Sequence, residues 1–120
     1  MGHGMSAKGW HIMRDHDAGL TLARQLPVRF DVSAEALFPV VGRLRLATQV
    51  RQDLWRILQQ VRGFTPVIRV QQDGDQLRLT AGGQVSGRAA KDQIERQISD
   101  LLASPSHRAR WVRNAGGTHA

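Results

Sequence analysis

The dipeptide Asp73-Gly74 constrains the fold of this chain most, because it separates two runs rich in β-branched and aliphatic residues within residues 66–81. Asp-Gly supplies the residues that a two-residue hairpin turn of type I′ requires. With that turn the register would pair Gln72 with Asp75, Val70 with Leu77, Arg69 with Arg78, and Ile68 with Leu79. Residues 66–81 therefore predict an antiparallel hairpin in which Ile68, Val70, Leu77 and Leu79 share one apolar face.

The segment after the hairpin predicts two helices. A loop over Gly82–Gly87 is followed by residues 88–103, whose apolar side chains recur at helical spacing (Ala90, Ile94, Ile98, Leu101 and Leu102). Ser104-Pro105 is typical of a helix cap followed by a first-turn proline, so a short further helix is expected to end near Asn114.

Residues 33–62 allow two interpretations, because Phe38-Pro39 disfavours a helix running through it. In the first, a helix starts with Pro39 in its first turn and ends at Gly63. Its apolar residues form one stripe along the helix (Val40, Leu44, Ala47, Val50, Leu54, Ile57, Leu58 and Val61). Arg43 is the one charged residue that falls inside this stripe and does not fit it. In the second, residues 40–47 form a strand and the helix starts at Thr48. Residues 39–47 are thus left as helix or strand.

The first third of the chain gives weaker signals. Residues 1–19 show no sustained apolar period and are expected to be flexible. Residues 18–26 permit a short helix ended by Pro27. Val28, Phe30 and Val32 alternate with charged residues, which predicts a strand.

These elements predict an α+β two-layer domain over residues 20–114, with residues 115–120 disordered. The expected order is β-α-β-β-α with a short C-terminal helix. The helices would pack on one face of a small, mostly antiparallel sheet.

Composition excludes several classes of function. The chain of 120 residues has no cysteine, which excludes disulfides, thiol nucleophiles and thiolate metal sites. It has no apolar stretch of the roughly 18 residues needed to span a membrane and no export signal. A cytoplasmic protein without a membrane partner is expected.

Motifs for catalysis, metal binding and cofactor binding are incomplete. Residues 82–89 approach the phosphate-loop pattern, but Arg88 and Ala89 replace the lysine and hydroxyl residue that its chemistry needs. The cluster His11, Asp15, His16 and Asp17 has no metal-ligand spacing. We therefore expect no enzyme, no metal and no cofactor.

Charge gives the one positive indication of function. Seventeen basic residues exceed ten acidic ones, and the arginines concentrate in residues 34–62 and 104–120. Such clusters suit an acidic partner. Two surfaces are candidates: the outward hairpin face with Arg69 and Arg78, and the C-terminal segment with Arg108, Arg110, Trp111 and Arg113. For Trp111 the alternative is that it pins the last helix onto the core.

The sequence thus predicts a non-enzymatic intracellular interaction module that binds an acidic protein surface. The alternative is a nucleic-acid-binding protein that uses the same arginine clusters, although the outward hairpin face lacks the aromatic residues on which RNA bases stack. A homo-oligomer formed through an unpaired sheet edge is a further possibility.

Overall fold

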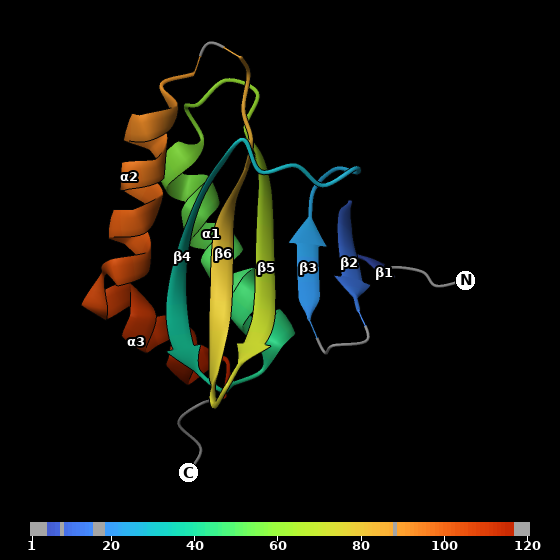
Figure 1. Ribbon diagram of the computed structural model, residues 1–120, viewed down its shortest axis with the longest axis vertical. Coiled ribbons are helices and arrows are strands. Elements are labelled where there is room, and N and C mark those ends of the chain that lie inside the picture. Colours follow the sequence, from blue (N-terminus) through green and yellow to red (C-terminus); the bar gives the residue numbers. More distant parts are fainter. Residues whose placement is uncertain (1–4, 8, 16–18, 88, 117–120) are drawn as a thin grey trace.

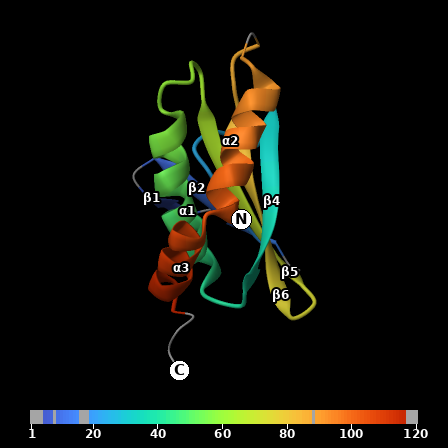
Figure 2. The ribbon, with the colours of Figure 1, turned by 90° about the vertical axis from the view of Figure 1, so that its left-hand side faces the viewer.

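The computed structural model describes residues 5–7, 9–15, 19–87 and 89–116. Within them, helices lie on one face of an antiparallel sheet, as Figures 1 and 2 show from two directions. The strands are β1 (Met5–Ala7), β2 (Trp10–Arg14), β3 (Leu20–Ala23), β4 (Val32–Pro39), β5 (Thr65–Asp73) and β6 (Gln76–Gln84). The helices are α1 (Arg43–Leu58), α2 (Lys91–Ala103) and α3 (Pro105–Asn114). The predicted class, a small α+β domain, is confirmed, although the order of its elements differs from the prediction.

The strand order in the sheet is β1-β2-β3-β5-β6-β4, and every neighbouring pair is antiparallel. The β5–β6 hairpin lies inside the sheet, flanked by β3 on one side and β4 on the other. Helix α1 packs on β5, β3 and β6, whereas α2 packs on β4. The core lies between these helices and the covered face of the sheet.

The hairpin is confirmed, but its predicted register is wrong. Gly74 and Asp75 form the turn, so Asp73 pairs with Gln76 and not Gln72 with Asp75. Gly74 holds a φ of +64°, as the first residue of a primed turn requires. Each residue of β5 pairs with a residue of β6 two positions further along the chain than predicted. A shift by two keeps every side chain on its predicted face, and Ile68, Val70, Leu77 and Leu79 are all fully buried. Arg69 now lies opposite Thr80, and Arg78 lies opposite Gln71.

The helix predicted over residues 18–26 is wrong, because residues 20–23 form strand β3. All four residues of β3 are buried between β2 and β5. Leu20 and Leu22 are two residues apart and fit a strand as well as a helix. Leu26, which the helix would have covered, is half exposed in the loop that follows.

The predicted strand over Val28–Val32 and both interpretations of residues 33–62 need correction. Strand β4 starts at Val32, where the predicted strand would have ended, and runs to Pro39. Residues 34–37 have the composition of a helix, yet pairing with β6 and packing against α2 keep them extended.

Helix α1 therefore starts later than Pro39 and earlier than Thr48. Gly42 is its N-cap, and it ends at Leu58. Gly63, predicted as the end of the helix, lies in the loop beyond it with a φ of +74°. The misfit Arg43 is the first helical residue and donates from Nη2 to Gln72 Oε1 (2.7 Å).

Helices α2 and α3 follow the sequence prediction closely. Helix α2 buries Ile94, Ile98, Leu101 and Leu102. Helix α3 has Ser104 as its N-cap residue and Pro105 in its first turn, and it ends at Asn114.

Part of the segment expected to be flexible is paired in the sheet. Strands β1 and β2 form a hairpin whose second strand pairs with β3. Trp10 and Ile12 are half-buried and pack against the core. The flexibility of residues 1–19 and the disorder of residues 115–120 stay predictions, and residues 117–120 lie outside the described part of the chain.

Candidate binding site

Arg69 and Arg78, the two arginines predicted on the outward hairpin face, bind carboxylates of the chain itself. Arg69 donates to Thr21 Oγ1 (2.9 Å) and pairs with Asp15 (3.2 Å). Arg78 pairs with Glu35 (2.9 Å) and Asp73 (2.5 Å).

The hydrogen bonds that the Arg78 guanidinium donates to these carboxylates, first Asp73 and then Glu35, raise its pKa. Internal partners therefore balance the charge of Arg69 and Arg78 on this face. Asp31 pairs with Arg29 (3.0 Å).

The predicted C-terminal residues also have internal partners. Arg108 donates to the carbonyl oxygens of Leu102 (3.0 Å) and Leu37 (2.6 Å), and its guanidinium lies 4.1 Å from the Phe38 ring centroid. Trp111 is fully buried and packs beside the same Phe38 ring. Its indole has no exposed surface for a partner, which agrees with the alternative that Trp111 pins α3 onto the core.

A residue that sequence reasoning missed, Asp53, holds α3 in place. Asp53 is buried on α1, where its carboxylate accepts a hydrogen bond from Trp111 Nε1 (2.7 Å) and pairs with Arg110. It is the only acidic residue among residues 43–62, and that isolation was the signal available in the sequence. Arg113 is exposed near the end of α3, and its role in binding stays a prediction.

The glycines of the phosphate-loop-like segment have a structural explanation. Gly82 and Gly83 belong to strand β6 and not to a loop. A Cβ atom at Gly82 would lie 2.0 Å from the carbonyl oxygen of Val32, and one at Gly83 would lie 2.0 Å from that of Thr65. Only glycine allows the neighbouring backbones to approach this closely.

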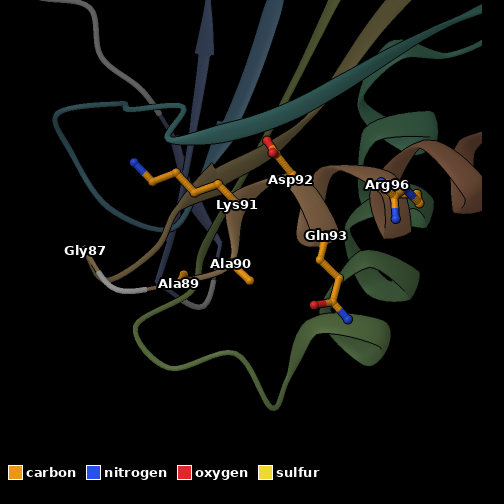
Figure 3. A pocket seen from close by; sticks show the side chains of 7 residues that line it. All are labelled: Gly87, Ala89, Ala90, Lys91, Asp92, Gln93 and Arg96. Atoms are coloured by element: carbon orange, nitrogen blue, oxygen red, sulfur yellow. The ribbon is translucent and has the colours of Figure 1, made fainter.

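The N-terminus of α2 forms a shallow hollow without converging ligands. Figure 3 shows Lys91, Asp92 and Gln93 pointing away from one another. Ala90, the N-cap residue, supplies no side-chain cap. These side chains do not cradle a common phosphate.

The described residues hold no group of three or more histidine, aspartate or glutamate side chains placed to bind a metal. Two members of the cluster considered in the sequence, His16 and Asp17, lie outside those residues.

One edge of the sheet, β4, already uses part of its hydrogen-bonding capacity. The Ser33 N–H donates to Glu95 Oε2 of α2 (2.8 Å), and Leu37 O accepts from Arg108 of α3. Side chains from two helices thus occupy backbone groups that a second chain would need. Association through a sheet edge stays a prediction.

A pocket rich in tryptophan and arginine lies where the ends of β2 and β3 meet α1. Its cavity of about 320 Å³, here called the tryptophan pocket, is lined by Trp10, Arg24, Arg51, Trp55, Phe64 and Pro66. Trp10 begins β2, Arg24 follows β3, and Arg51 and Trp55 stand one turn apart on α1. Trp55 is 46% exposed, whereas Phe64 closes the pocket from the core side.

Two guanidinium groups share the indole of Trp10. The Arg51 guanidinium carbon lies 4.6 Å from the ring centroid, and that of Arg24 lies 5.7 Å away. Burial, and then the neighbouring charge of Arg24, lower the pKa of Arg51. Among the described residues, none that lines the pocket is acidic. The pocket therefore places the positive charge of Arg51 beside the aromatic surface of two tryptophans.

Sequence reasoning missed this pocket because its residues are far apart in the chain. Trp10 lies in the segment expected to be flexible, and Trp55 lies outside the apolar stripe of its helix. The available signal was the spacing of Arg51 and Trp55, which places the two side chains on one helix face.

No protein-family model, curated protein or solved structure matches this chain. Among the described residues, no helix has the length and apolar character needed to cross a membrane.

Proposed function

We propose that this protein is a non-enzymatic binding module of the cytoplasm and that the tryptophan pocket anchors an acidic protein partner. The observation that carries the proposal is the Arg51 guanidinium, whose carbon lies 4.6 Å from the Trp10 ring centroid in a pocket whose described lining residues include no carboxylate. An acidic side chain entering there would pair with the Arg51 guanidinium.

The chemistry of the pocket is that of a protein-binding hot spot. Tryptophan and arginine are the residue types that most often dominate binding energy in protein interfaces. Trp55 offers exposed aromatic surface, and Arg51 is held beside it on a rigid helix. The net charge of +7 supports steering of an acidic partner toward this surface.

The distribution of charge favours a protein over a nucleic acid. Nucleic-acid binding draws on several cations that contact successive phosphates. Arg69, Arg78 and Arg110, which the nucleic-acid alternative needs, are paired with carboxylates of the chain. Arg51 offers one guanidinium in one pocket, which suits a short acidic segment more than a run of phosphates.

Binding of two labelled polyanions tests the proposal. Fluorescence anisotropy with poly-L-glutamate and with oligo-dT, at matched salt, measures the preference directly. We expect poly-L-glutamate to bind more tightly. Arg51→Gln should weaken that binding by about tenfold, because a hydrogen bond to a charged group contributes about 1.5–3 kcal/mol.

Arg45→Gln is the matched control, since Arg45 is an exposed arginine of α1 outside the pocket. It should weaken poly-L-glutamate binding less than about twofold, as expected for a remote surface charge. Equal losses in both variants, or tighter binding of oligo-dT, would contradict the proposal.

A further inference from the structure

We infer that the tryptophan pocket recognises one aromatic side chain of its partner, flanked by carboxylates, and does not recognise acidic residues alone. This inference rests on the proposed function and names the sequence feature that the pocket selects.

The size of the pocket limits what can enter it. Its volume of about 320 Å³ lies at the lower end of the range of about 300–1,000 Å³ that ligand pockets occupy. A pocket of this size suits one ring-bearing side chain rather than a length of folded chain. Acidic side chains by themselves would leave the apolar walls formed by Phe64 and Pro66 without a partner.

The lining favours an aromatic ring over an aliphatic side chain. Trp10 already carries Arg51 and Arg24 near its ring, whereas Trp55 takes part in no ring or cation contact among the described residues. The indole of Trp55 is therefore the surface against which an incoming ring can stack.

The geometry of α1 sets the distance between the ring and its carboxylates. Arg51 and Trp55 are four residues apart, so their side chains begin about 5–6 Å from each other on one helix face. Neighbouring residues of a peptide are about 3.8 Å apart at their Cα atoms. A carboxylate one or two positions from the aromatic residue can thus reach Arg51 while the ring lies on Trp55.

Three labelled peptides test this inference: Glu-Glu-Tyr-Glu-Glu, Glu-Glu-Leu-Glu-Glu and Glu-Glu-Ala-Glu-Glu. We expect the tyrosine peptide to bind about tenfold more tightly than the alanine peptide, with the leucine peptide between them. Trp55→Ala should remove most of the tyrosine preference, so that its affinities for the tyrosine and alanine peptides differ by less than about twofold. Arg51→Gln should weaken binding of all three.

Ile57→Ala is the control, because Ile57 is exposed on the same helix and does not line the pocket. It should preserve the tyrosine preference. Trp55→Leu repeats the test with a side chain that keeps apolar bulk, and circular dichroism of each variant checks that it folds.

The possible failures are distinguishable. Equal affinity for the three peptides, with poly-L-glutamate still bound through Arg51, would overturn this inference and leave the proposed function standing. Absence of binding to every acidic polypeptide would overturn both. Tighter binding of adenosine monophosphate than of the tyrosine peptide would assign the pocket to a nucleotide and overturn the inference.

Discussion

Asp53 is the residue on which the attachment of α3 to α1 depends. Its carboxylate is buried and accepts from Trp111 while pairing with Arg110. Asp53→Ala would leave the indole N–H and a guanidinium without their acceptor, so we expect a loss of about 2–3 kcal/mol in the free energy of unfolding. Urea denaturation measures this loss.

Arg56→Ala serves as the comparison, because Arg56 contacts the same carboxylate from the surface with 71% of its side chain exposed. It should cost about 0–1 kcal/mol, as exposed ion pairs do. Equal losses in the two variants would mean that Asp53 does not anchor α3.

Asp31 gives the protein a pH-dependent component of stability. A hydrogen bond from Arg29, and then one from the Val85 N–H, lower the pKa of Asp31 below the ordinary 3.8. A carboxyl group whose pKa is lowered by folding contributes stability that is present above its ordinary pKa. That stability is lost as the pH falls through the lowered value.

The variant Asp31→Asn cannot ionise and should lose this component. Its melting temperature should lie furthest below that of the parent near about pH 6, and the gap should narrow toward about pH 3. Asp100→Asn, on the exposed surface of α2, is the control for removing one surface carboxylate, and at about pH 6 its melting temperature should lie close to that of the parent. A gap that stays constant with pH would contradict the role given to Asp31.

The central hairpin depends on the backbone conformation of its turn. Gly74 has a φ of +64°, and a Cβ added there would meet no atom within 4 Å. Gly74→Val should therefore destabilise the fold through strain alone, by about 1–2 kcal/mol or more. Gly87→Val is a matched control, because Gly87 also has open space around it but does not have a positive φ. Similar melting temperatures for the two variants would contradict this explanation.

The elements predicted correctly are those whose signals lie close together in the sequence. Ser104-Pro105 determines the start of α3, and the spacing of Ile94 and Ile98 identifies α2. The apolar alternation beside Gly74 placed both faces of the hairpin correctly, although the turn itself lies one residue later. Strands β3 and β4 could not be predicted this way, because burial and pairing with distant strands override their local preferences.

The binding site, too, depends on contacts between residues that are distant in the sequence. Five of the six residues chosen from charge and local spacing have internal partners, because folding brings carboxylates to four of them and backbone carbonyl oxygens to Arg108. The tryptophan pocket is assembled from residues spread between positions 10 and 66. Its chemistry is visible only once β2, β3 and α1 meet.

The position of the β5–β6 hairpin inside the sheet also determines when the sheet can form during synthesis. Among the described residues, β4 pairs only with β6, and β3 pairs with β5 as well as with β2. A nascent chain that has emerged as far as Leu58 contains the first four strands and all of α1. It still lacks the partner of β4 and most of the surface that α1 covers. The apolar side of α1 therefore stays largely uncovered, and β4 stays unpaired, until β5 and β6 have left the ribosome.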